Sequence, residues 1–188
     1  MRIDLTVPLQ KELLESILSS ENFLSKFGHF GTHFDVMDKT FPLEYGERNG
    51  KLFDVSSVAG RDIEASDIDL EQIEAGDFVI LRTGVMEKEA YGSPQYFSEG
   101  PQLSRNLLEQ LAQKKIALVG IDMAGVRKGR EHRTADQFFA DQDIFVVENL
   151  YNLQLLMEYC DREFIVHTYP LAMTGVTGLT SRVVAEMK

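Results

Sequence analysis

The sequence predicts an α/β domain, and three observations lead to this prediction. Short β-rich runs alternate along the chain with stretches whose apolar residues recur at helical spacing. Segments rich in Gly, Pro and polar residues separate these runs. The length of 188 residues suits one compact domain with its own hydrophobic core. We therefore expect residues 1–188 to form a single domain.

Strands are expected where a short run of residues is mainly apolar or β-branched. Six runs meet this description, namely Ile3–Val7, Leu52–Val55, Phe78–Arg82, Ile116–Ile121, Ile144–Val147 and Phe164–Tyr169.

Two amphipathic helices are expected between the strands, because their apolar residues line one face. The first face consists of Leu9, Leu13, Leu14, Ile17 and Leu18. The second consists of Leu103, Leu107, Leu108 and Leu111. Ser104 or a neighbour is expected to begin the second helix, and Ser66 or Asp67 to cap a shorter one.

Three segments have no regular pattern, and they are Gly28–Asn49, Thr83–Pro101 and Met123–Arg130. Loops held by a rigid scaffold supply many binding and catalytic groups, so a site is expected in these segments. We also interpret Thr83–Pro101 as a lid or an arm for dimer contact.

Charge and cysteine content restrict the partners and the compartment. The formal net charge is −11 and no Lys/Arg stripe stands out, so nucleic acid is not an expected partner. Cys160 is the sole cysteine, which excludes an internal disulfide and fits a reducing compartment. No run approaches the roughly 20 apolar residues of a membrane helix. We expect a cytoplasmic protein without a membrane partner.

The first candidate metal ligands lie in the segment His29-Phe30-Gly31-Thr32-His33-Phe34-Asp35. Imidazoles four residues apart can reach one cation, and Asp35 adds a carboxylate nearby. Gly31 allows the backbone to bend between them. The spacing alone is equally compatible with two ordinary hydrogen-bonded histidines.

A second group of candidates lies in Glu131-His132-Arg133 and Val146-Val147-Glu148-Asn149. Glu148 directly follows an apolar run, and glutamate is seldom buried unless it is paired or ligated. Glu148 therefore either faces water at the end of a strand or belongs to a site. Without further context the residues favour the water-facing interpretation.

Together these segments resemble the cyclase-type metal hydrolases, a family that includes bacterial kynurenine formamidase. His29–Asp35 is similar to the family signature H-x-G-T-H-x-D. Similar segments follow in the family's order over nearly the whole chain, at Asp4-Leu5-Thr6, Ile80-Leu81-Arg82-Thr83-Gly84, Val119-Gly120-Ile121-Asp122, Glu131-His132-Arg133, Glu148-Asn149-Leu150 with Asn152-Leu153, and Tyr169-Pro170-Leu171.

The resemblance implies a swivelling β/β/α domain with a mixed sheet, assembled as a homo-oligomer, either a dimer or a tetramer. It also implies one or two divalent ions, Zn²⁺ or Mn²⁺, with Asp35 as a bridge. The implied ligands are His29, His33, Asp35, His132 and Glu148.

The implied function is hydrolysis of a small amide, either a formamide of the kynurenine type or a cyclic amide of the isatin type. In such a reaction the metal lowers the pKa of a bound water from 15.7 toward about 7 and supplies a hydroxide nucleophile.

The chain departs from the family pattern directly after Asp35. The relatives continue with x-P-x-H, whose histidine shuttles protons, whereas this chain has Val36-Met37-Asp38-Lys39. Lys39 could replace the histidine if neighbouring cations lowered its pKa, and Asp38 could if its pKa were raised. Both are also typical of solvated loop residues. The alternative function is therefore a metal-binding cyclase-like protein without catalysis, acting in ligand sensing or as a structural module.

Overall fold

The computed structural model describes residues 1–19, 21 and 28–188. Within these residues, no helix is both long enough and apolar enough to span a membrane. The elements in chain order are β1 (Arg2–Asp4), α1 (Lys11–Ser19), β2 (His33–Asp35), η1 (Leu43–Gly46), β3 (Glu47–Asp54), η2 (Ala65–Asp67), η3 (Leu70–Gln72), β4 (Phe78–Arg82), α3 (Val85–Lys88), α4 (Pro94–Ser98), α5 (Arg105–Gln113), β5 (Leu118–Ile121), η4 (Gly129–Glu131), α6 (His132–Ala140), β6 (Phe145–Glu148), α7 (Leu153–Met157), β7 (Phe164–Pro170) and β8 (Gly178–Met187).

The strands form one mixed sheet in the order β1-β8-β2-β6-β5-β4-β3-β7. Neighbours from β3 to β6 are parallel, and β2, β7 and β8 are antiparallel to their neighbours. Because β7 pairs with both β3 and β8, the strands from β8 to β7 close into a barrel. β1 and β2 pair with successive parts of the same edge of β8. The predicted α/β class with a mixed sheet is confirmed.

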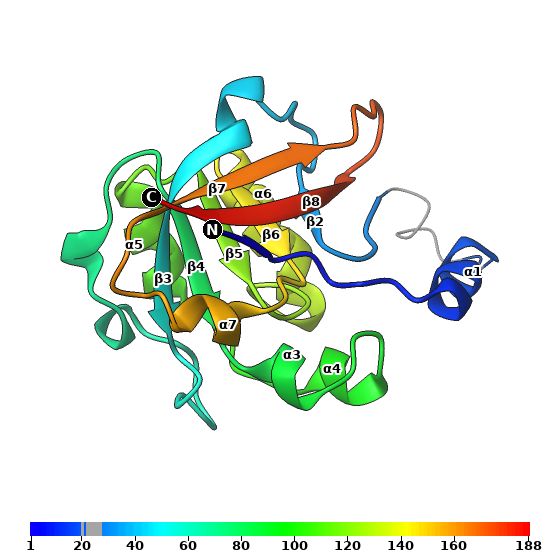
Figure 1. Ribbon diagram of the computed structural model, residues 1–188, viewed down its shortest axis with the longest axis horizontal. Coiled ribbons are helices and arrows are strands. Elements are labelled where there is room, and N and C mark those ends of the chain that lie inside the picture. Colours follow the sequence, from blue (N-terminus) through cyan, green and yellow to red (C-terminus); the bar gives the residue numbers. More distant parts are fainter. Residues whose placement is uncertain (20, 22–27) are drawn as a thin grey trace.

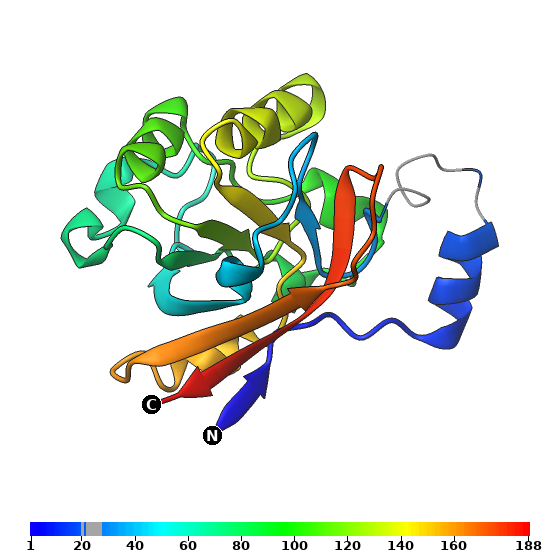
Figure 2. The ribbon, with the colours of Figure 1, turned by 90° about the horizontal axis from the view of Figure 1, so that it is seen from above.

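Side chains of the strands alternate between two hydrophobic clusters. Phe34, Ile80 and Val147 belong to the cluster inside the barrel. Val79 and Val146 belong to the other cluster, on the face that α5 and α6 cover. Figure 2 shows these helices on one side of the parallel strands, with β7 and β8 on the opposite side. The same alternation directs the residues on either side of Phe34 toward the helices.

All six predicted strands are present with shifted ends, except that Phe78–Arg82 matches β4 at both ends. Two strands were not predicted, β2 and β8. The expectation that Gly28–Asn49 is irregular was therefore wrong, since this segment contains β2 and the start of β3. Polar residues interrupt the apolar pattern of β8, and its pairing with β1, β2 and β7 stabilises it instead.

The expectation that Thr83–Pro101 is irregular was also wrong, because the segment contains α3 and α4 (Figure 1). Ser93 caps α4 by accepting a hydrogen bond from the backbone N of Tyr96 at 3.1 Å, and Pro94 occupies the first turn. Tyr96 is buried in the helix-facing cluster. This buried side chain attaches the segment to the core.

The predicted helix starts have different outcomes. Ser104 is the N-cap of α5 and accepts from the backbone N of Leu107 at 3.1 Å, as predicted. Ser66 and Asp67 lie inside η2 and do not cap a later helix. Asp69 caps η3 instead, because its carboxylate accepts from the backbone N of Glu71.

The first predicted helix is present as α1, but none of its residues is buried. Figure 1 shows α1 projecting away from the sheet. Its apolar face therefore has a different environment from that of α5, whose leucines pack into the core.

Candidate metal centre

The pairing of β2 with β6 brings the first polar groups together. His33 lies opposite Glu148 in the antiparallel register, and Asp35 shares the helix-facing side of β2. Nε2 of His33 is 3.6 Å from Oε2 of Glu148 and 3.8 Å from Oδ1 of Asp35. These three residues are at most 3% exposed. The structure therefore contradicts the water-facing interpretation of Glu148.

His29 reaches the same point from the loop before β2. Its Nδ1 lies 2.9 Å from Oδ1 of Asp35, and its Nε2 lies 2.8 Å from the Thr177 hydroxyl. The ring packs against Gly178, where an added Cβ would be 2.8 Å from the imidazole. A residue with a side chain at position 178 would displace His29 from the cluster.

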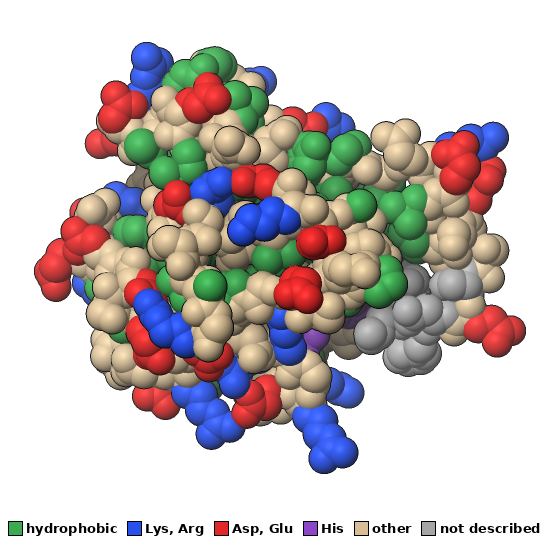
Figure 3. Space-filling view, turned by 90° about the horizontal axis from the view of Figure 1, so that it is seen from below, with side chains coloured by type: hydrophobic (Ala, Val, Ile, Leu, Met, Phe, Trp, Pro, Cys, Tyr) green, Lys and Arg blue, Asp and Glu red, His purple; other side chains and the backbone are tan. Residues whose placement is uncertain are grey.

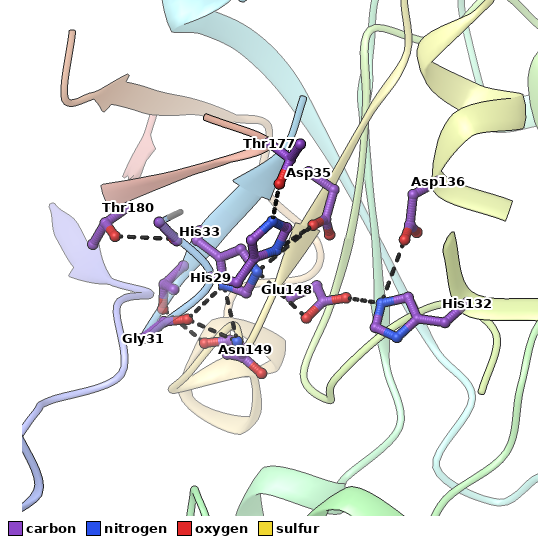
Figure 4. A network of polar contacts seen from close by, with 12 residues as sticks. His29, Gly31, His33, Asp35, His132, Asp136, Glu148, Asn149, Thr177 and Thr180 are labelled. Carbon is purple, nitrogen blue, oxygen red and sulfur yellow. Dashed lines mark hydrogen bonds and ion pairs between the residues drawn. The ribbon is translucent and has the colours of Figure 1, made fainter. Parts of the chain in front are cut away.

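His132 begins α6 and approaches from the helical side of the site. Its Nε2 is 2.8 Å from Oε1 of Glu148, and its side chain is 37% exposed. An added Cβ at Gly125 would lie 2.9 Å from this nitrogen, and the φ of +87° also favours glycine there. Figure 4 shows Glu148 between His33 and His132.

Asp136 also belongs to the cluster, although sequence reasoning did not select it. It lies one helical turn after His132, and its Oδ2 is 3.4 Å from Nε2 of that histidine. Its side chain is only 4% exposed. The available signal was the H-x3-D spacing, which places both side chains on one face of a helix.

Hydrogen bonds behind the site define the tautomer of His33. Its Nδ1 donates to the carbonyl oxygen of Gly31 at 2.9 Å, because a carbonyl can only accept. Asn149 donates to the same carbonyl at 2.7 Å and accepts from the hydroxyl of Tyr96. Burial lowers the pKa of His33, which keeps the ring neutral. Nε2 is therefore unprotonated and faces Asp35 and Glu148.

The buried carboxyl groups affect one another strongly. Burial raises the pKa of Glu148 well above its usual value, and the charge of Asp35 raises it further. Burial and then the charge of Asp35 have the same effect on the pKa of Asp136. Burial also opposes ionisation of Asp35, but the hydrogen bond from His29 helps to bring its pKa below the usual value. A cation among these groups would relieve the repulsion.

The pattern of unpartnered atoms tests whether a metal ion fits. Four buried side-chain nitrogen or oxygen atoms of the described residues have no hydrogen-bond partner. Three belong to this cluster, Nε2 of His33, Oδ2 of Asp35 and Oδ1 of Asp136. Imidazole nitrogen and carboxylate oxygen suit Zn²⁺ and Mn²⁺. The residues present therefore fit a divalent cation.

The candidate ligand atoms fall into two groups that share Asp35. One group takes an atom from each of His29, His33 and Asp35, all within 4.8 Å of one another. The other takes an atom from each of Asp35, His132 and Asp136, within the same limit. On the face in Figure 3, histidine side chains reach the surface over only a small area.

The structure places Asp38 and Lys39 just beyond β2, where both contact the outer side of α6 and its C-terminus. Nζ of Lys39 is 3.0 Å from Asp141 and 3.4 Å from Asp38, and Asp38 accepts from Gln137 at 2.8 Å. The contact with Asp141 raises the pKa of Lys39, and the hydrogen bond from Gln137 lowers the pKa of Asp38. Both directions are opposite to those that proton transfer at neutral pH requires.

Comparison with known proteins identifies the family. The Cyclase family model, described as "Putative cyclase", matches residues 3–127. The chain belongs to the Cyclase family. The match includes His29, His33 and Asp35 and ends before α6. No curated protein matches the chain in sequence.

Several solved structures have the same fold. A protein described as a potential metal-dependent hydrolase with cyclase activity is 23% identical, with 98% of this chain and 96% of that chain covered and a TM-score of 0.75. A predicted metal-dependent hydrolase from Bacillus stearothermophilus is 21% identical, with 98% and 97% covered and a TM-score of 0.71. Isatin hydrolase A from Ralstonia solanacearum is 16% identical, with 98% and 91% covered and a TM-score of 0.77. The predicted cyclase-like β/β/α fold is confirmed.

Proposed function

We propose that this Cyclase family member is a divalent-metal-dependent hydrolase of a small amide. The observation that carries the proposal is the convergence of unpartnered, buried ligand atoms from β2 and α6. Burying such groups unsatisfied costs free energy, and a bound cation offsets that cost. Similar folds in proteins described as metal-dependent hydrolases support the same function.

The proposed ligands hold one or two ions, Zn²⁺ or Mn²⁺, with Asp35 between the two groups. They are His29, His33, Asp35, His132 and Glu148. When bound, the cation would polarise a substrate carbonyl and lower the pKa of a water molecule. The chain's own contribution is orientation, because the Gly31 carbonyl, which also accepts from Asn149, accepts from the His33 ring and holds it in position.

A cavity of about 610 Å³ supports a substrate with an apolar or aryl group. It adjoins the candidate metal centre, since its lining includes Val36, which follows Asp35, and Thr177, which contacts His29. Much of the remaining lining is apolar, including Phe41, Leu43, Leu171, Met173 and Val176. A cyclic amide fused to an aryl ring has this character, and the likeness to an isatin hydrolase favours it over a formamide.

Lys39 and Asp38 remain the proposed residues for proton transfer, and both line this cavity. In the described arrangement Asp141 holds the Lys39 ammonium charged. A substrate that separated this ion pair would free the ammonium to protonate a leaving nitrogen, a role typically worth about 100- to 10,000-fold in rate.

The experiment is metal analysis combined with turnover. Protein purified without chelator is analysed for metal per chain, and hydrolysis of aryl formamides and cyclic aryl amides is measured before and after chelation. His33→Ala should lose both metal and turnover. His167→Ala is the matched control. His167 lies on β7 and pairs with Glu186 on β8, so it is not one of the proposed ligands. A wild-type protein that binds neither Zn²⁺ nor Mn²⁺ would contradict the proposal, as would turnover that survives metal removal.

One observation favours the alternative of a non-catalytic metal-binding protein. The position of the family's shuttle histidine holds Lys39, which is paired with Asp141 and Asp38 in the described structure. Such a protein would bind metal as tightly as the enzyme and would hydrolyse none of the amides. If an amide raised the melting temperature of the metal-bound protein and no product formed, the result would favour ligand sensing over hydrolysis.

Assembly and location remain proposals. A homo-oligomer, either a dimer or a tetramer, is supported by α1, whose leucines Leu13, Leu14 and Leu18 are not buried within the chain. A single domain over residues 1–188 is supported by the pairing of β1 with β8, which come from the two ends of the sequence. Analytical ultracentrifugation measures the oligomeric state, and limited proteolysis tests whether the chain is a single domain. The cytoplasmic location stays a prediction.

A further inference from the structure

Asp136 has features that a purely structural aspartate does not need. It is 3% exposed, and its Oδ1 has no hydrogen-bond partner. It lies within ligand distance of Asp35 and His132, since one atom from each falls inside a 4.8 Å group. Figure 4 shows its carboxylate directed toward the same His132 nitrogen that contacts Glu148.

A role limited to orienting His132 explains these features poorly. The separation of 3.4 Å from Nε2 is long for a charge-assisted hydrogen bond, which is usually about 2.7–2.9 Å. That nitrogen is also closer to Glu148, at 2.8 Å. One oxygen of Asp136 would remain buried without a partner, at a cost in free energy.

The neighbouring charges point the same way. Asp35 has an oxygen within 4.8 Å of an Asp136 oxygen, and Glu148 contacts the same His132 nitrogen as Asp136. Three buried carboxyl groups at one point destabilise a protein unless a cation neutralises them. Among the residues that the structure describes, the ion pairs of Asp35, Asp136 and Glu148 are all with histidines, and no Arg or Lys side chain provides this cation.

We propose that Asp136 is a direct ligand of a second divalent cation, and that it makes this position selective for Mn²⁺ over Zn²⁺. This inference rests on the proposed metal-dependent function and deepens it. The second position has carboxylates from Asp35, Asp136 and Glu148 and a single, partly exposed imidazole from His132. The first position has two buried or nearly buried imidazoles, from His29 and His33. Oxygen-rich sites favour Mn²⁺, and imidazole-rich sites favour Zn²⁺.

The test is titration of chelator-treated protein with Mn²⁺ alone and with Zn²⁺ alone, followed by calorimetry and by electron paramagnetic resonance of Mn²⁺. The variants are Asp136→Asn and, as the matched control at the C-terminal end of the same helix, Asp141→Asn. Asp141 is an exposed aspartate that pairs with Lys39. Wild type and Asp141→Asn should bind two Mn²⁺ per chain and give the signal of a coupled pair. Asp136→Asn should bind one, with the second affinity weakened more than the roughly 100-fold expected for an outer-shell partner.

A second variant keeps the test decisive if the asparagine form does not fold. Asp136→His replaces oxygen with nitrogen, so it should retain two ions while the second position changes its preference from Mn²⁺ to Zn²⁺. Unchanged stoichiometry and preference in the variants would overturn the inference and leave the hydrolase proposal standing. A wild-type protein that binds only one Mn²⁺ per chain would also overturn the inference and leave the hydrolase proposal standing. Wild type that binds no ion would instead remove the proposed function.

Discussion

Replacing Glu148 with glutamine should stabilise the metal-free protein and remove most of its stabilisation by metal. Glu148 is buried opposite His33 and close to Asp35. Glutamine keeps a similar shape and one acceptor oxygen but has no charge to bury. These two effects have opposite signs, so general damage to the fold would not produce both.

The stabilisation without metal follows from the raised pKa of Glu148. Burial and the charge of Asp35 raise this pKa in the folded state, so the folded protein binds more protons than the unfolded chain. Wild-type stability is therefore complete below the unfolded pKa and falls as the pH rises through the folded pKa. A tenfold difference in the acid dissociation constant of Glu148 between the two states corresponds to about 1.4 kcal/mol. The advantage of Glu148→Gln should be present at pH 7 and disappear near pH 4.

The loss of metal stabilisation follows from mass action. At a metal concentration of 100 times Kd, a protein that binds only when folded gains about 2.7 kcal/mol. A domain of this size melts roughly 2–4 °C higher per kcal/mol, so the wild type should gain about 5–11 °C. Glu148→Gln should gain much less, because it lacks a ligand.

The assay is differential scanning calorimetry with and without Mn²⁺, at pH 7 and pH 4. Glu163→Gln is the matched control, because the Glu163 side chain is 82% exposed. Its melting temperature should follow the wild type under every condition. A full metal-induced shift in Glu148→Gln would refute the ligand assignment. A metal-free melting temperature at or below that of the wild type at pH 7 would refute the charge-burial argument.

Three further predictions test the barrel, the support of the site and proton transfer. Phe34→Ala should lose about 3–5 kcal/mol in urea unfolding because Phe34 is fully buried, whereas Leu43→Ala, at a residue 78% exposed, should change stability by less than about 0.5 kcal/mol. Asn149→Ala should weaken Mn²⁺ binding by about 10- to 100-fold in calorimetric titration, because the Gly31 carbonyl that orients His33 loses a hydrogen-bond donor. The control Asn106→Ala, on the exposed side of α5, should bind Mn²⁺ like the wild type. Lys39→Ala should lower kcat by about 100-fold or more at unchanged metal content, and an unchanged kcat would exclude Lys39 from proton transfer.

The sequence predicted those elements whose stability is mainly local. The leucines of α5 recur at helical spacing and Ser104 provides the cap, so the helix and its start were both recognisable. β4 is a run of four apolar residues followed by Arg82, and it matched at both ends. By contrast, β8 contains polar residues and exists because three other strands pair with it. Pairing partners far apart in sequence leave no local pattern.

The sequence by itself determined the family and predicted the candidate donor atoms and the segments that carry them, because H-x-G-T-H-x-D places its three ligand-type residues close together along the chain. Only the tertiary structure decided that Glu148 is buried and that Asp136 joins it. The physical reason is that both positions depend on non-local packing: the register of β2 on β6 places Glu148 opposite His33, and α6 packs its first turns over that face.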